Sequence, residues 1–168
     1  KNAARETKQQ LRELLSKAGA SEVLTYSFVH ENTMKKAGQN PEHGYRLSNA
    51  LSPDLQYYRT ALMPSLLDKV SMNIRAGHDQ FALFEMNKVH FKGEMDKHEP
   101  TVPNEDAHIA LILAATDKAK PEGAAFYQLK KYLEQVVDPG IEQVALADFD
   151  IASDERGAEL VAPYHPGR

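Results

Sequence analysis

Apolar residues recur every three or four positions near the start of the chain, which predicts a helix over residues 3–18. The intervening positions are mostly charged or polar, so this helix is expected to bury one face and expose the other. Gly19 follows directly, and glycine is common just after the last helical turn. The apolar positions of this helix are Leu11, Leu14, Leu15 and Ala18.

The same spacing predicts two more long helices. One is expected to begin near Pro64, because proline is well tolerated in the first helical turn, and to end at Gly77. The other covers residues 125–137, and a short polar helix is expected at residues 31–37. Helices therefore account for less than half of the chain.

Strand-forming residues occupy several of the segments between these helices. Residues 23–29 alternate in part and are rich in β-branched and aromatic side chains, which is typical of a strand. Residues 81–91 predict a second strand, and the nearly continuous apolar run at residues 107–115 predicts a central one. Shorter strands are expected at residues 45–47, 144–146 and 160–162.

Turns and loops connect these elements. Ser52 and Pro53 lie in a turn that is expected to cover residues 49–54. Residues 92–106 hold a glycine, two prolines and many charges, and they predict a non-helical connector. Because this connector joins two strands directly, the pattern favours an α+β domain, with helices on an antiparallel or mixed sheet, over a doubly wound parallel sheet.

Composition narrows the class of protein. The 168 residues suit one domain over residues 1–168, and 42% hydrophobic with 26% charged residues is an ordinary globular balance. The apolar run at residues 109–115 is far shorter than the ~20 residues of a membrane helix. The absence of cysteine excludes disulfides and thiolate catalysis and fits a cytoplasmic protein. A net charge of −4 gives no general attraction to nucleic acid.

Candidate chemistry is sparse. The chain contains no glycine-rich phosphate loop and no nucleophilic serine with the flanking glycines that such a serine requires. The seven histidines are scattered, without the spacing of a helical metal site. Glu85 lies among apolar residues of a predicted strand, so we expect it to be buried with a partner such as Arg59. The residues alone therefore assign no catalytic, cofactor-binding or metal-binding group.

Five segments together resemble the beta-subunit family of phenylalanine–tRNA ligases. Their order and spacing cover almost the whole chain, and the segments at residues 51–67 and 164–168 are the most specific. The other three are residues 21–29, 84–89 and 126–134. The residues that belong to these family motifs in a structural role are Ser52, Pro53, Arg59, Thr60, Pro64, Leu67, Asn73, Phe84, Glu85, His165, Pro166, Gly167 and Arg168.

The resemblance implies a fold like that of class II aminoacyl-tRNA synthetases, with an antiparallel sheet flanked by helices. The helix at residues 3–18 and the strand after it are similar to the first class II motif, a subunit-interface element, so the four apolar positions of that helix become candidate interface contacts. The strand at residues 81–91 is similar to part of the second motif. Residues 87–91 lack the arginine that binds ATP in active members, so a catalytically silent domain is expected.

The resemblance also implies partners. In this family the domain packs against the alpha subunit within a heterotetramer, and ATP, Mg²⁺ and tRNA are bound by the complete enzyme. The chain is therefore expected to be excised from a longer beta subunit, truncated at its C-terminal end, and able to self-associate through the surface left exposed. The alternative is a self-sufficient nucleotide-binding or tRNA-binding domain.

Overall fold

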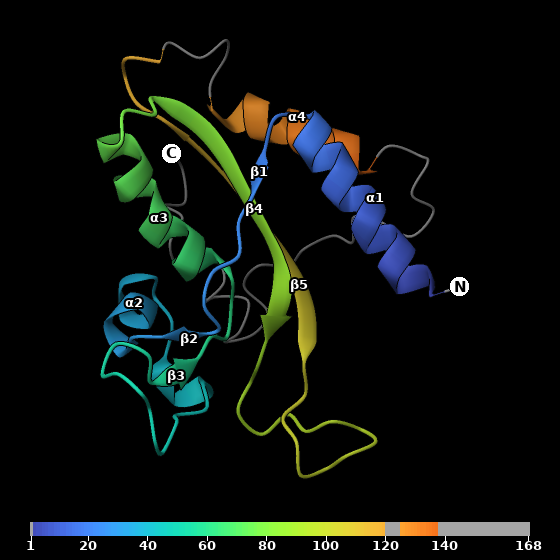
Figure 1. The fold of residues 1–168 in the computed structure, drawn as a ribbon, viewed down its shortest axis with the longest axis vertical. Helices are drawn as coiled ribbons and strands as arrows, with labels where there is room; N and C mark the ends of the chain where they lie inside the picture. The colour runs from blue at the N-terminus through green and yellow to red at the C-terminus, as the bar shows by residue number, and fades with distance from the viewer. Residues whose placement is uncertain (1, 120–124, 138–168) are drawn as a thin grey trace. The chain divides into compact units, whose positions relative to one another are not determined.

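The computed structural model describes residues 2–119 and 125–137 (Figure 1). The chain divides into two compact units, and each is described here by itself. The expectation of one domain stays a prediction, and the strands expected at residues 144–146 and 160–162 lie outside the described residues. Of the described residues, unit 1 comprises residues 2–24, 66–86, 109–119 and 125–137, and unit 2 comprises residues 25–65 and 87–108.

Unit 1 begins with the expected amphipathic helix, α1 (Ala3–Lys17). The helix ends where glycine was expected to end it: Gly19 has a φ of 99°, and the backbone N–H of Ala20 donates to the carbonyl of Leu15 at 3.0 Å. Its apolar face packs in a core formed by Leu15, Ala20, Ala82, Phe84 and Met86. The hydrophobic spacing therefore predicted both the helix and the side that it buries.

The sheet of three strands has the order β1-β4-β5, and its strands are Ser21–Glu22, Gln80–Val89 and Asp106–Ala115. β1 pairs with β4 in parallel, with Ser21 opposite Leu83. The chain then turns back, so that β5 runs along β4 in the opposite direction (Figure 1). The sheet is mixed, which is one of the two arrangements that the pattern favoured, and it corrects the antiparallel sheet that the family resemblance implied. A parallel pair requires a crossover connection, and a long stretch that includes α3 (Met63–Arg75) provides it here.

The expectation that the strand at residues 107–115 is central was wrong for the described part of the sheet. There, β4 has a neighbour on each side, and β5 has one. The burial of the two strands agrees with this order: five consecutive residues of β4, 82–86, are buried, whereas only Ile112 is buried in β5. Among the described strands, a continuous apolar run thus did not mark the strand that has two neighbours.

The other long helices formed as expected. α4 (Ala125–Val137) lies beside α1, and its Tyr132 packs against the core of unit 1 (Figure 1). The helix α3 begins at Met63 with Pro64 as its second residue, and Gly77 follows its end with a φ of 96°. No helix within the described ranges combines the length and the apolar content that crossing a membrane demands.

The strand expected at residues 23–29 formed only at its last two residues. Its first residues lie outside β1, which ends at Glu22, and its last two form β2 (Phe28–Val29), which pairs antiparallel with β3 (Tyr57–Tyr58) in a second sheet. Side-chain alternation marked the extended conformation correctly. It could not show that the chain leaves one sheet and enters another, because that depends on partners distant in the sequence.

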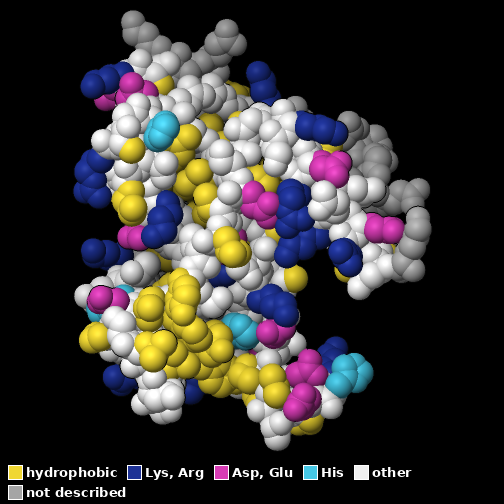
Figure 2. Space-filling model, viewed as in Figure 1, with side chains coloured by type: hydrophobic (Ala, Val, Ile, Leu, Met, Phe, Trp, Pro, Cys, Tyr) yellow, Lys and Arg dark blue, Asp and Glu magenta, His cyan; other side chains and the backbone are white. Residues whose placement is uncertain are grey.

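Unit 2 is built around the pair of β2 and β3. The short helix α2 (Glu31–Lys36) was expected, and the side chain of His30 caps it by accepting from the N–H of Asn32 at 2.9 Å. A 3-10 turn at Pro41–His43 follows. Figure 2 shows hydrophobic side chains gathered over the region of β2 and β3. The core of this unit consists of Val29, Met34 and Tyr57.

The segment at residues 45–47, expected to be a strand, runs along β3 through a single isolated bridge. That bridge joins Arg46 and Tyr57. The backbone N–H of Tyr58 also donates to the carbonyl of Tyr45 at 2.9 Å. In the turn that follows, the hydroxyl of Ser52 accepts from the N–H of Asp54 at 3.1 Å, so the expected turn is present.

Candidate functional site

Arg59 is one of the family-motif residues and is almost completely buried, with 1% of its surface exposed. It follows β3 directly, and its backbone connects two other segments of unit 2. Its N–H donates to the carbonyl of Ser27 at 3.1 Å, and its carbonyl accepts from the N–H of His90 at 3.1 Å. Arg59 therefore lies between Ser27, just before β2, and His90, just after β4.

The guanidinium group of Arg59 extends these backbone contacts. Nη1 donates to the hydroxyl of Thr25 at 2.7 Å, and Nε donates to the carbonyl of Lys88 at 3.3 Å. A planar guanidinium carries five N–H donors in a fixed fork, which suits it to holding several acceptors at once. Arg59 thus ties together the segments around residues 25–27 and 88–90 with its own.

A row of rings lies beside this cluster. The centroids of Tyr26 and Phe28 are 5.6 Å apart, those of Phe28 and Tyr58 are 4.6 Å apart, and those of Tyr58 and His90 are 4.5 Å apart. These separations lie in the range at which tilted aromatic pairs attract. Tyr26 is 59% exposed whereas His90 is buried, so the row leads from the solvent to the interior of the unit.

His90 is held by the loop between β4 and β5. Its Nδ1 lies 3.1 Å from the carbonyl oxygen of Asn104, and because a carbonyl only accepts, Nδ1 carries the proton. The side-chain amide of Asn104 in turn donates to Asp106 at 2.8 Å. Sequence reasoning missed both Asn104 and Thr25 as partners, since nothing in their local sequence indicates which distant residue they contact.

Two buried hydroxyls lie just after Arg59 in the chain. The side-chain oxygens of Thr60 and Ser65 have no hydrogen-bond partner. Pro64, between them, is buried at the start of α3. A buried hydroxyl without a hydrogen bond costs about 1–3 kcal/mol relative to a hydrogen-bonded one.

The remaining motif residues are dispersed. Phe84 and Glu85 are both fully buried in the middle of β4. Asn73 donates from its side chain to the carbonyl of Lys69 at 2.9 Å, within α3. Leu67, Ser52 and Pro53 are partly or largely exposed. The expected motif residues that lie outside the described residues are His165, Pro166, Gly167 and Arg168.

The four apolar positions of α1 differ in their surroundings. Leu15 is buried in the core of its own chain, and Leu11 packs against that core. Leu15 is therefore removed from the four possible interface contacts, because a side chain buried in its own core presents no surface to a partner. Leu11, Leu14 and Ala18 are each half-buried, and they remain candidates.

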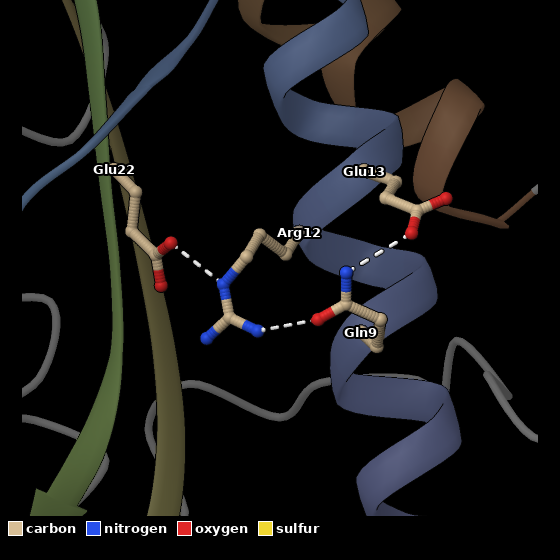
Figure 3. Close-up of polar contacts among 4 residues, drawn as sticks. All are labelled: Gln9, Arg12, Glu13 and Glu22. Carbon is tan, nitrogen blue, oxygen red and sulfur yellow. Dashed lines mark hydrogen bonds and ion pairs between the residues drawn. The ribbon is translucent and has the colours of Figure 1, made fainter.

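A polar network occupies another part of the α1 surface (Figure 3). Nε of Arg12 donates to the carboxylate of Glu22 at 2.6 Å, and its Nη1 donates to Gln9 at 3.0 Å. Gln9 donates in turn to Glu13 at 3.0 Å. The hydrogen bond that Arg12 donates to Glu22, together with the negative charge of that carboxylate, raises the pKa of Arg12. The network links α1 to β1 and makes this side of the helix polar.

We searched the described residues for a metal site and for the ATP-binding arginine of the second class II motif. Across residues 2–119 and 125–137, no three histidine or carboxylate side chains come together as candidate metal ligands. The segment expected to match the ATP-binding motif, residues 87–91, contains Lys88 and no arginine. Lys88 itself is paired with Glu105.

Comparison with known proteins gives consistent relatives. The phenylalanine–tRNA ligase beta subunits of Geobacter sulfurreducens and Solibacter usitatus are 29% and 28% identical to this chain, over 95% and 99% of its length. These alignments cover 20% and 21% of those proteins. The chain therefore spans about a fifth of the length of the curated relatives that it matches.

Solved structures with the same fold are aminoacyl-tRNA synthetases. The pyrrolysyl tRNA synthetase of Desulfitobacterium hafniense superposes with a TM-score of 0.62 over 82% of this chain and 45% of that one, at 17% identity. At this identity the likeness shows the fold, which is that of class II synthetases. The family described as the phenylalanyl tRNA synthetase beta chain CLM domain matches residues 1–168. The chain thus belongs to the beta-chain family of phenylalanyl tRNA synthetases.

Proposed function

We propose that this chain is a catalytically silent scaffold domain of phenylalanine–tRNA ligase, the enzyme that attaches phenylalanine to its tRNA using ATP. The observation that carries the proposal is the family match over all 168 residues. The whole relatives are beta subunits of that ligase. The chain would contribute to the reaction by packing against the alpha subunit, which would bind ATP with Mg²⁺ and phenylalanine.

The surroundings of Arg59 support a silent role. Its guanidinium is almost completely buried and bonded to Thr25 and to the carbonyl of Lys88. An arginine that binds a nucleotide phosphate has to present its N–H donors to the ligand. In this chain the donors serve internal contacts instead, so the side chain stabilises the fold.

The scaffold role would be carried by an apolar contact with the alpha subunit. Subunit interfaces of obligate complexes are larger and more apolar than transient ones. On α1, the half-buried Leu11, Leu14 and Ala18 are the candidate contacts. Leu15 is not, because it belongs to the internal core. The same surface would allow the isolated chain to self-associate when the alpha subunit is absent.

Native mass spectrometry of the alpha subunit with and without this chain tests the scaffold role. The expected result is a stable mixed complex that is weakened by Leu14→Glu and unaffected by Leu51→Glu, a matched change at an almost fully exposed position of unit 2. Circular dichroism checks that both variants fold. A mixture in which alpha and this chain never associate would contradict the proposal.

The rival functions predict binding by the chain alone. Calorimetry with ATP–Mg²⁺ and with phenylalanine would reveal a self-sufficient nucleotide-binding domain through saturable heat. A direct tRNA-binding domain would give an affinity that falls steeply as salt is raised. The net charge of −4 favours neither a phosphate-binding surface nor a tRNA-binding one.

A further inference from the structure

One tyrosine hydroxyl fastens the loop between β4 and β5 to the rest of unit 2. The oxygen of Tyr45 accepts from the N–H of Gly93 at 3.0 Å, and the same hydroxyl donates to Sδ of Met95 at 3.4 Å. The backbone of Tyr45 is itself anchored, since its carbonyl accepts from the N–H of Tyr58 in β3. The phenol is therefore a fixed point to which two positions of the loop are attached.

The loop depends on Met95 for its own folding as well. Met95 forms an isolated bridge with Pro103, and the flanking backbone is bonded across the loop by Asn104 to Glu94 and by Asp96 to Val102, each at 2.9 Å. The loop is thus a closed hairpin whose first arm contacts Tyr45. A chemical change at the sulfur of Met95 would act on the point where this arm is held.

Met95 is partly exposed to the solvent and so to small reagents. Its side chain is 40% exposed, in contrast to the buried Met34 and Met86. Thioether sulfur is oxidised to the sulfoxide by peroxides, and the product can be reduced again enzymatically. In the reaction with hydrogen peroxide, the sulfur forms a bond to one oxygen, the O–O bond breaks, and the other oxygen leaves as water; sulfur loses two electrons and the peroxide gains them.

We propose that Met95 is a reversible oxidation site. Its oxidation breaks the hydrogen bond from the hydroxyl of Tyr45 to Met95, which holds the loop at residues 92–105 and which we call the Tyr45 latch. In the thioether, a sulfur lone pair accepts the phenol O–H. In the sulfoxide, the sulfur is electron-poor and no longer accepts this hydrogen bond, because the acceptor is now an oxygen displaced from the position at which the phenol O–H points. Tyr45 then keeps its bond from Gly93 and loses the one to Met95, so the first arm of the hairpin is held at one point where it was held at two.

The latch is tested on the 168-residue chain with graded hydrogen peroxide, followed by mass spectrometry of each methionine and by hydrogen exchange of the loop amides. The second exposed methionine, Met72 in α3, is replaced by leucine in one set of samples, so that the response belongs to Met95. We expect Met95 to be oxidised while Met34 and Met86 stay reduced. Loop exchange should then rise by about two- to tenfold, the effect of losing one side-chain hydrogen bond.

Two variants separate the latch from general loosening. Tyr45→Phe should show the raised exchange before any peroxide is added and no further rise afterwards. Met95→Leu should behave in the same way, and circular dichroism verifies its fold. The proposal is overturned if Met95 stays reduced at peroxide levels that oxidise Met72 in the parent chain, if Met95 sulfoxide leaves loop exchange unchanged, or if Tyr45→Phe retains the full response to oxidation.

Discussion

The guanidinium Nη1 of Arg59 lies 2.7 Å from the hydroxyl oxygen of Thr25, and this contact joins two segments far apart in the sequence. Arg59 is one of the positions that carry the family resemblance, and here it serves the fold. A buried charge is expensive to leave without acceptors, which makes the Thr25 hydroxyl more important than an ordinary threonine hydroxyl.

We therefore expect Thr25→Val to lower the free energy of unfolding by about 1–3 kcal/mol, because the guanidinium would lose an acceptor that water cannot replace in the interior. Thr25→Ser keeps the hydroxyl and is the matched control, with a loss well below that of valine. Urea denaturation followed by circular dichroism measures both. Equal losses in the two variants would mean that the hydroxyl contributes nothing through Arg59.

Two adjacent leucines of α3 should respond very differently to truncation. Leu66 is 0% exposed and Leu67 is 37% exposed. Removing a fully buried leucine side chain leaves a cavity, so Leu66→Ala is expected to cost about 2–5 kcal/mol. Leu67→Ala keeps the same helix propensity change and should cost about 1 kcal/mol or less. Denaturation midpoints of the two variants provide the comparison, and a reversed order would contradict the burial.

Gly44 is required by close packing. A Cβ built there would meet the carbonyl oxygen of Tyr58 at 3.0 Å and that of Pro41 at 3.4 Å, both of them backbone atoms. Since neither can move as a side chain can, Gly44→Ala is expected to destabilise the protein by about 1–3 kcal/mol. Its φ of −97° is open to any residue, so the cost would come from the contact. Thermal unfolding measures the effect. If the variant unfolds at the same temperature as the parent, the backbone moves enough to accept the Cβ, and the prediction is wrong.

The pair of Glu31 and Lys35 in α2 predicts a response to acid. The hydrogen bond and charge of Lys35 lower the pKa of Glu31, and Glu31 raises the pKa of Lys35. A carboxyl with a lowered pKa stabilises the folded state above its unfolded pKa, and that stabilisation is lost as the pH falls through the folded value. NMR titration should place Glu31 below the ordinary range for glutamate.

The control for this pH effect is Lys35→Gln, which removes the positive charge and keeps a long polar side chain. The pKa of Glu31 should then return toward its ordinary value. Because both side chains lie at the surface, the effect should also weaken as salt is added. An unchanged Glu31 titration in the variant would show that Lys35 is not its cause.

Local pattern predicted the local structure well. The helix α1 and its end at Gly19 follow from spacing and from glycine chemistry, and α3 begins near Pro64 as expected. What the pattern missed was decided by distant partners. The segment at residues 23–29 has strand-like residues throughout, yet only Phe28 and Val29 form a strand, because β1 before the segment pairs with β4 whereas β2 pairs with β3.

The candidate site shows the same division. Burial of Glu85 followed from its apolar neighbours, and a structural role for Arg59 followed from the family motif and from the absence of nucleotide-binding groups. The acceptors of Arg59, Thr25 and the carbonyl of Lys88, could not be predicted. A hydroxyl and a backbone oxygen carry no mark in the sequence that shows which donor will reach them.

The parallel pairing of Ser21 with Leu83 also constrains how unit 1 can fold in time. Contacts between residues far apart in the sequence form slowly. The intervening chain must first be closed into a loop, and this entropy cost precedes the favourable free energy of the contact. On the ribosome, α1 and β1 emerge long before β4 has been synthesised. Their apolar face would remain uncovered during that interval, so it would be open to aggregation or to chaperone binding until β4 arrives.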